Sequence, residues 1–220
     1  RNPAISTRSK YIKGGGFRNN AYIVISSEKE AENFLDGGKY DREDLIKSGM
    51  PKFDYAIQNK DADKILIMPT TRNFEYSTIR DNPKESTYYK FSKKIIESVP
   101  DNLKDKIVYI PHPIVMSIIG KTDLEQYMPK ETKYDELLKD TKLLITDYSS
   151  ISFDAFYRGC NLIYVWIEKE MCLKEMDVDL MLNEDNVFAD VAYDYNTLTE
   201  LISKNYYENP SEENIRKYRE

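Results

Sequence analysis

The sequence predicts an α/β fold built on a Rossmann-like parallel sheet flanked by helices. Short apolar runs rich in β-branched residues alternate with segments of helical periodicity along most of the chain. These runs are continuously apolar, as is typical of strands that helices cover on both faces. Because parallel strands need a crossover connection, usually a helix, the alternation and the continuous apolar runs predict the same architecture.

Five strands and seven helices are expected, each bounded by glycine, proline or polar residues. The expected strands are Tyr22–Ile25, Lys64–Met68, Ile107–Ile110, Leu143–Thr146 and Leu162–Val165. The expected helices are Glu28–Leu35, Arg42–Lys47, Thr87–Val99, Tyr134–Lys139, Ile151–Tyr157, Thr197–Tyr207 and the charged tail Ser211–Glu220. The aromatic cluster Tyr88, Tyr89 and Phe91 is interpreted as the apolar face of a helix, with no ligand assigned to it.

The chain is expected to contain one complete domain and an appendage. Residues 1–60 hold a glycine run at Gly14–Gly16 and a single expected strand, which is too little for a domain core. They are interpreted as the end of a preceding N-terminal domain, with the polar stretch Gln58–Asp63 as a linker. Residues 61–220 are predicted to form the Rossmann-like domain.

Composition excludes several classes of function. With 32 basic and 38 acidic residues, the net charge is -6, and no basic run suggests a nucleic-acid groove. No stretch reaches the ~20 apolar residues that span a bilayer. Two cysteines, Cys160 and Cys172, are too few for a disulfide framework and are expected to be free thiols in a reducing, cytoplasmic setting. A single histidine, His112, excludes a histidine-rich metal site.

The segments that follow three of the expected strands carry the candidate site. In open α/β sheets, ligands bind outside the carboxyl ends of the strands. Those positions are occupied by Pro69-Thr70-Thr71-Arg72, Pro111-His112-Pro113 and Asp147-Tyr148-Ser149-Ser150.

Ser149 and Ser150 stand where a buried strand stops and a helix begins. A helix start offers unpaired amides and about half a positive charge, so two hydroxyls there predict a phosphate or diphosphate site. The alternative is that the serines only cap the helix, and the two roles can coexist.

Arg72 and His112 are the other candidate ligand-binding residues. From its strand end, the planar guanidinium of Arg72 can hold phosphate oxygens in a bidentate way, although a surface ion pair is an equal alternative. His112 lies between two prolines that restrict its backbone, which suits ligand contact, whereas packing against a loop is the alternative. Asp147 is expected to orient a neighbour, because no oxygen-rich metal cage surrounds it or Asp154.

Together these segments resemble the CDP-glycerol glycerophosphotransferase family, the teichoic acid polymerases and primases. The shared features are a strand followed by Pro69-Thr70-Thr71-Arg72, the pair His112-Pro113 and the turn Thr146-Asp147-Tyr148-Ser149-Ser150. The resemblance extends upstream to Gly49-Met50-Pro51-Lys52-Phe53-Asp54. It implies that this chain is the C-terminal, donor-binding half of a two-domain GT-B enzyme.

The resemblance also implies a reaction and a set of roles. A polymer-end or lipid-linked hydroxyl attacks the β-phosphorus of CDP-glycerol or another CDP-polyol and CMP leaves, without metal or cofactor. Arg72 and His112 are then catalytic, and the donor diphosphate is bound by Arg72, His112, Thr146, Asp147, Ser149 and Ser150. The family's early histidine motif, thought to supply the base, is absent, so the base is expected outside this chain and the fragment is expected to be inactive alone.

Two alternatives stay open from the sequence. One is a GT-B glycosyltransferase that uses a nucleotide sugar, because its phosphate-binding chemistry is the same. The other is a non-catalytic nucleotide-binding module. The longer protein is expected in the cytoplasm, peripheral to the inner face of the membrane.

Overall fold

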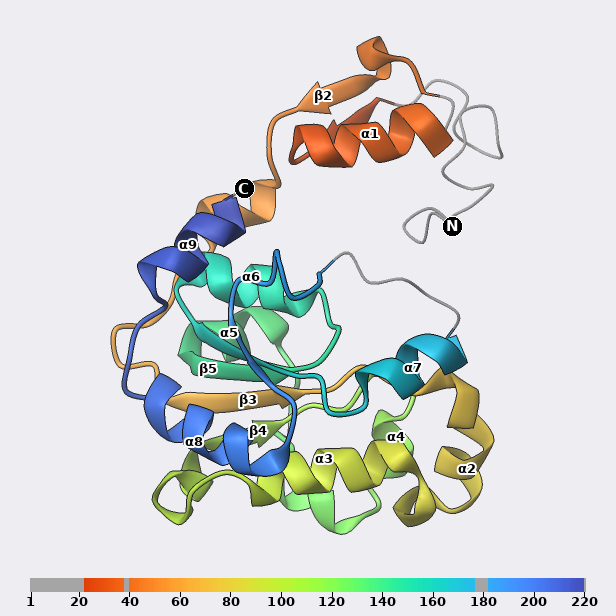
Figure 1. The fold of residues 1–220 in the computed structure, drawn as a ribbon, viewed down its shortest axis with the longest axis vertical. Helices are drawn as coiled ribbons and strands as arrows, with labels where there is room; N and C mark the ends of the chain where they lie inside the picture. Colours follow the sequence, from red (N-terminus) through yellow and green to blue (C-terminus); the bar gives the residue numbers. More distant parts are fainter. Residues whose placement is uncertain (1–21, 38–39, 177–181, 220) are drawn as a thin grey trace. The chain divides into compact units, whose positions relative to one another are not determined.

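The computed structural model describes residues 22–37, 40–176 and 182–219. The chain divides into two compact units, residues 1–55 and 56–220 (Figure 1). In the first unit, strand β1 (Ile23–Ile25) is followed by helix α1 (Glu28–Gly37) and then by β2 (Leu45–Lys47), which pairs with β1 in parallel. The glycine run Gly14–Gly16 lies outside the described residues.

The helix predicted over Arg42–Lys47 is wrong. Arg42–Asp44 form one 3₁₀ turn and Leu45–Lys47 form β2, paired from Ile23↔Leu45 to Ile25↔Lys47. Pairing with β1 outweighs the weak helical preference of so short a segment. The described part of the first sixty residues therefore holds two strands rather than the single one expected.

The second unit holds a five-stranded, fully parallel sheet, which confirms the predicted fold class. The strand order is β4-β3-β5-β6-β7, and every pairing is parallel. The strands are β3 (Lys64–Met68), β4 (Ile107–Tyr109), β5 (Thr141–Thr146), β6 (Asn161–Val165) and β7 (Asp190–Ala192). Sequence reasoning missed β7, whose three residues begin with an aspartate, so its identity as a strand rests on its register with β6.

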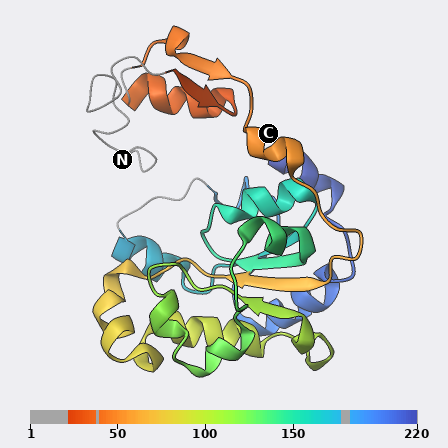
Figure 2. The same ribbon diagram turned by 180° about the vertical axis from the view of Figure 1, so that it is seen from behind.

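Helices cover both faces of this sheet, as Figures 1 and 2 show from opposite sides. Alternate residues of β3 point to opposite faces, so Ile65 and Ile67 join one core and Leu66 the other. The first core is closed by α2 (Tyr76–Asp81), α3 (Thr87–Glu97), α4 (Met116–Ile119) and α8 (Tyr195–Asn205). The second is closed by α5 (Tyr134–Asp140), α6 (Ile151–Arg158) and α9 (Glu212–Arg219). The expected aromatic face of α3 is confirmed, since Tyr88, Tyr89 and Phe91 are all buried.

Helix α7 (Lys169–Met176) follows β6 and, like α2 and α4, was not predicted. Among the described residues, no helix combines the length and the apolar character that crossing a bilayer requires.

Residues 58–63, which were expected to be a linker, are hydrogen-bonded to the rest of the second unit. Gln58 Nε2 donates to the carbonyl of Thr141 at 2.7 Å, and the amide of Asn59 donates to the carbonyl of Lys139 at 2.8 Å. The amide of Asp63 donates to the carbonyl of Asp140 at 3.2 Å. Residues 58–63 thus pack along the end of α5 and the start of β5, in agreement with the division of the chain after Tyr55.

Candidate functional site

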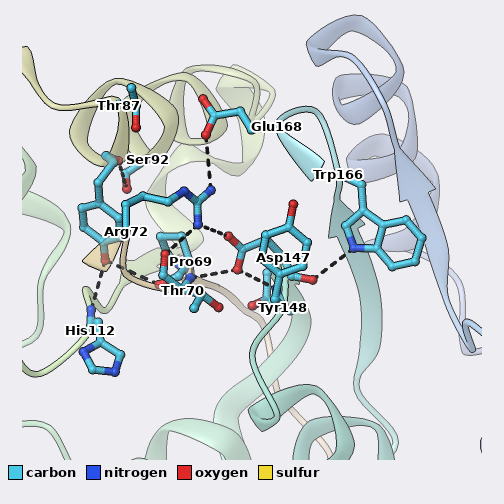
Figure 3. A network of polar contacts seen from close by, with 12 residues as sticks. Pro69, Thr70, Arg72, Thr87, Ser92, His112, Asp147, Tyr148, Trp166 and Glu168 are labelled. Atoms are coloured by element: carbon cyan, nitrogen blue, oxygen red, sulfur yellow. Dashed lines mark hydrogen bonds and ion pairs between the residues drawn. The ribbon is translucent and has the colours of Figure 1, made fainter. Parts of the chain in front are cut away.

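The carboxyl ends of β3, β5 and β6 meet in a buried polar network, drawn in Figure 3. Its centre is Arg72, whose side chain is fully buried. Arg72 Nη1 donates to Asp147 Oδ2 at 2.7 Å and to the carbonyl of Thr70 at 2.8 Å, and Nη2 lies 3.3 Å from Glu168 Oε2. Three strand ends are thereby tied to one cation.

Aromatic rings line the remaining sides of the guanidinium. Its central carbon lies 4.8 Å from the ring centre of Phe91 and 5.8 Å from that of Tyr148, distances typical of cation–π contacts. Burial opposes the charge of Arg72, but the neighbouring Asp147 carboxylate raises the pKa above its ordinary value, so the side chain stays protonated. Burial raises the pKa of Glu168, because it disfavours the charged carboxylate, and the positive charge of Arg72 opposes this increase.

Asp147 organises the two loops that follow β3 and β5. Its Oδ1 accepts hydrogen bonds from the amides of Thr70 at 2.8 Å and Tyr148 at 2.7 Å, while Oδ2 pairs with Arg72. Its carbonyl accepts a hydrogen bond from Trp166 Nε1 at 3.2 Å. The carboxylate is completely enclosed and acts by orienting its neighbours, as the sequence suggested.

The start of α6 presents two serines in different ways. Ser150 occupies the cap position, but its side chain makes no capping hydrogen bond and is exposed. Ser149 Oγ accepts only a long bond, 3.4 Å, from the amide of Ile151. No acceptor among the described residues takes a hydrogen bond from the Ser149 or Ser150 amides. Capping therefore accounts poorly for the serines, and donors remain for a ligand.

His112 is fixed at the end of β4. Its amide donates to Tyr88 Oη at 3.0 Å, and Tyr88 in turn lies 3.5 Å from the carbonyl of Pro69. Nδ1 accepts from the amide of Ile114 at 3.3 Å, which places the proton of the neutral ring on Nε2. The half-buried ring thus offers one N–H donor away from its own loop.

Comparison with known proteins identifies the group to which these features belong. Residues 6–220 match the model of the family described as CDP-Glycerol:Poly(glycerophosphate) glycerophosphotransferase. The chain belongs to this family. Two similar proteins are the minor teichoic acid biosynthesis protein GgaB of Bacillus subtilis (strain 168), 27% identical, and the teichoic acid poly(ribitol-phosphate) polymerase of Bacillus spizizenii, 26% identical. The matches cover 84% and 81% of this chain but only 22% and 29% of those proteins.

Solved structures of the wall teichoic acid polymerase TagF share the fold. A TagF variant soaked with CDPG matches with a TM-score of 0.65 at 17% identity, and TagF itself with 0.64 at 16%. Each match covers 90% of this chain and 52% or 53% of TagF, so this member of the glycerophosphotransferase family spans about half of the TagF chain.

Three of the predicted site residues, Arg72, Thr146 and Asp147, are buried, and both carboxylate oxygens of Asp147 are engaged within the protein. Arg72 is enclosed and its terminal nitrogens are engaged, so its direct contact with a donor phosphate stays a prediction. Thr146 is buried as well, and its hydroxyl donates to the carbonyl of Met68 at 2.6 Å, which joins β5 to β3. Ser149, Ser150 and His112 are the predicted residues that have polar groups near the surface.

Buried polar atoms without partners gather at this edge of the sheet. Four of the seven found among the described residues are Thr70 Oγ1, Thr71 Oγ1, Arg72 Nε and Tyr148 Oη. Such atoms are rare in native proteins, and a ligand or ordered water usually completes their bonding. Their concentration makes this edge a polar region just beneath the candidate site.

Trp166 and Glu168 are site residues that sequence reasoning missed. They follow β6, so the strand-end rule that singled out the other three loops applies to them equally. No grouping of histidine, cysteine and carboxylate side chains suited to a metal ion occurs in the described part of the chain.

Proposed function

We propose that this chain binds the CDP-polyol donor of a phosphotransferase that extends a teichoic-acid-like or capsular polymer. The observation that carries the proposal is the group of donors at one sheet edge: the His112 ring and the hydroxyls and amides of Ser149 and Ser150, just before α6. A donor diphosphate at this edge would receive hydrogen bonds from all of them and the favourable field of the helix start.

In the proposed reaction, the acceptor hydroxyl oxygen forms a bond to the β-phosphorus of the donor. The bond from that phosphorus to the oxygen of CMP breaks, and the hydroxyl proton passes to a base. Hydrogen-bond donors that are already in position before the reaction lower its barrier, because they stabilise the negative charge that develops on the phosphate oxygens and on the departing CMP. His112 donates from Nε2 in this scheme, so the base is expected outside this chain.

Arg72 supports the proposed site from behind. Its ion pairs hold the loops after β3, β5 and β6 together and so keep Ser149 and Ser150 in place. The guanidinium itself is not exposed to a ligand. Any direct bond to phosphate would require the guanidinium to leave Asp147 or Glu168. We place the reaction in the cytoplasm, beside a membrane that presents the lipid-linked acceptor.

The test is the double substitution Ser149→Ala and Ser150→Ala, followed by calorimetric titration with CMP and CDP-glycerol. Each lost hydrogen bond to charged phosphate is worth about 1.5–3 kcal/mol, so affinity should fall at least tenfold. Stability should change by less than ~1 kcal/mol, because neither serine makes a good cap. CDP-ribitol and UDP-sugars, titrated in parallel, identify the donor class.

Ser211→Ala is the matched control. Ser211 Oγ accepts from the amide of Asn214 at 3.1 Å and caps α9. Its loss should lower stability by about 1 kcal/mol and leave nucleotide affinity unchanged. Unchanged affinity in the double variant would reject the phosphate role of the serines, and the absence of any cytidine nucleotide binding by the wild type would reject the proposed function.

A further inference from the structure

The hydroxyl group of Tyr88 joins two of the loops that form the candidate site. Tyr88 lies in α3, and its side chain is fully buried. Its Oη accepts a hydrogen bond from the amide of His112 at 3.0 Å, after β4, and donates a long one, 3.5 Å, to the carbonyl of Pro69, after β3. The amide of Tyr88 donates to Glu75 Oε1 at 2.7 Å, which anchors the same residue to the segment beyond Arg72. One residue of α3 therefore holds loops from both strands.

Packing alone gives no reason for a hydroxyl group at position 88. Tyr88 belongs to the core that α3 closes, and a phenylalanine ring would fill the same volume. A hydroxyl buried among apolar side chains is costly unless it is hydrogen-bonded. Burial raises the pKa of Tyr88 well above its ordinary value, so the hydroxyl stays neutral and keeps its proton for donation. What the hydroxyl adds to the ring is therefore its bond to His112.

Two further buried hydroxyl groups hold this part of α3 against β4. Tyr109, in β4, donates from Oη to Ser92 Oγ at 3.1 Å, and Ser92 Oγ donates to the carbonyl of Tyr88 at 2.8 Å. All three side chains are fully enclosed. A buried polar network whose members are hydrogen-bonded is rigid. The hydroxyl of Tyr88 therefore has one defined position.

His112 depends on this support because its own segment offers little else. Pro111 and Pro113 have no N–H, so the His112 amide is the single backbone donor of these three residues. Its bond to Tyr88 fixes the loop, and the amide of Ile114 fixes the ring through Nδ1 at 3.3 Å. The imidazole points away from the buried network (Figure 3).

We infer that Tyr88 is a positioning residue: through the His112 amide, its hydroxyl holds the imidazole N–H where it donates to the donor diphosphate. The inference rests on the proposed function and adds a residue that acts on the ligand only through His112. Sheet order places β4 and β5 on opposite sides of β3, so a diphosphate that contacts both His112 and Ser149 needs the two loops held in fixed positions. Asp147 ties the loop after β5 to the loop after β3, and Tyr88 does the same for the loop after β4.

The experiment compares variants of the full chain with the wild type by calorimetric titration with CDP-glycerol. His112→Ala removes a hydrogen bond to charged phosphate and should weaken binding by about tenfold or more. Tyr88→Phe leaves that donor present but unsupported, and should weaken binding by about fivefold. In the double variant that carries both substitutions, the affinity should equal that of His112→Ala alone, because Tyr88 acts only through His112.

Tyr206→Phe is the matched control. Tyr206 is also a buried tyrosine, and its Oη donates to the carbonyl of Asp63 at 2.9 Å, at the opposite, amino end of β3. Each tyrosine substitution removes one buried hydroxyl and its hydrogen bond, so the two melting temperatures should fall by similar amounts. Only Tyr88→Phe should change the affinity for CDP-glycerol.

A spectroscopic measurement reports on His112 directly. Because His112 is the only histidine, the imidazole C–H signals in a proton–carbon NMR spectrum belong to this residue alone. Tyr88→Phe should move these signals before any ligand is added, and should reduce the shift that CDP-glycerol causes. Tyr206→Phe should do neither.

The outcomes separate this inference from the proposed function. If the wild type binds CDP-glycerol but Tyr88→Phe binds it as tightly, or if Tyr88→Phe weakens the binding of His112→Ala further, the positioning role is wrong and the serine site stands. Imidazole signals that are the same in Tyr88→Phe and the wild type also overturn the positioning role. A wild type that does not bind CDP-glycerol overturns both.

Discussion

At the scale of single residues, the most unusual feature is the complete burial of the charged Arg72 side chain. A guanidinium removed from water carries a large desolvation cost, which is offset here by Asp147, Glu168, the carbonyl of Thr70 and two aromatic rings. The favourable terms depend on every partner being present. Breaking such a network should therefore cost more than breaking a surface pair.

Asp147→Asn tests this dependence. The amide retains one acceptor but removes the charge that opposes Arg72, so the free energy of unfolding should fall by about 3 kcal/mol. Urea denaturation followed by circular dichroism measures it. Asp135→Asn is the control: Asp135 pairs with Lys139 at 2.7 Å and with Arg158 at 2.6 Å, but is 57% exposed, so the loss should stay below ~1 kcal/mol. Equal losses in the two variants would contradict the structural role of the network.

The two cysteines should be inert in the native protein. Both are buried free thiols, and the Cys160 thiol donates to the carbonyl of Thr141 at 3.0 Å. Burial raises the pKa of Cys160 to about 12 and that of Cys172 to about 11, so few thiolates exist at pH 8. A thiol-specific chromogenic reagent should react more than about a hundredfold faster in urea than in buffer. Rapid reaction of either thiol in buffer would contradict their burial.

At the scale of elements, sequence reasoning succeeded where a segment determines its own structure. Strands β3, β5 and β6 each contain an unbroken apolar run of three or more residues and were found within two residues of their observed ends. By contrast, β2 and β7 have three residues each, and their strand character comes from a partner distant in the sequence. The residue pattern within such a short segment does not reveal the strand with which it will pair.

The same limit explains which parts of the site were foreseen. The strand-end rule located the loops after β3, β4 and β5, because it depends only on chain order. It did not reveal that Arg72 is enclosed, since arginine is usually exposed and its burial depends on Asp147 and Glu168, which lie far along the chain. Of the two serines for which helix capping was the alternative, Ser150 makes no capping hydrogen bond, because its backbone has helical angles instead of the extended ones that a capping side chain needs.

Gly159 is the element-scale feature with a direct test. It ends α6 in the left-handed conformation, with φ of 101°. A Cβ there would make only ordinary contact with Gln58 Oε1, at 3.5 Å, so the cost of Gly159→Ala comes from the backbone. Unfolding free energy should fall by about 1–2 kcal/mol. Gly159→Asn should lose less, because asparagine tolerates this conformation. Equal stability of the alanine variant and the wild type would show that the turn readjusts.

At the scale of the whole molecule, the second unit is a compact body built around its own sheet. Its five strands are covered on both faces, and each face has its own core. The candidate diphosphate edge lies within residues 56–220. Binding of the donor is therefore expected to be a property of this unit.

This expectation predicts where the chain can be cut. A fragment that begins at Ala56 should unfold cooperatively and bind CMP with the affinity of the full chain. A fragment that begins at Lys64 loses the hydrogen bonds from Gln58, Asn59 and Asp63 to the end of α5 and the start of β5. At about 0.5–1.5 kcal/mol for each bond, it should be less stable by at least ~2 kcal/mol. Thermal denaturation and calorimetry on the two fragments and the full chain measure both quantities. If the longer fragment fails to fold or to bind CMP, the first unit contributes to the donor domain, and equal stability of the two fragments would show that residues 56–63 only connect the units.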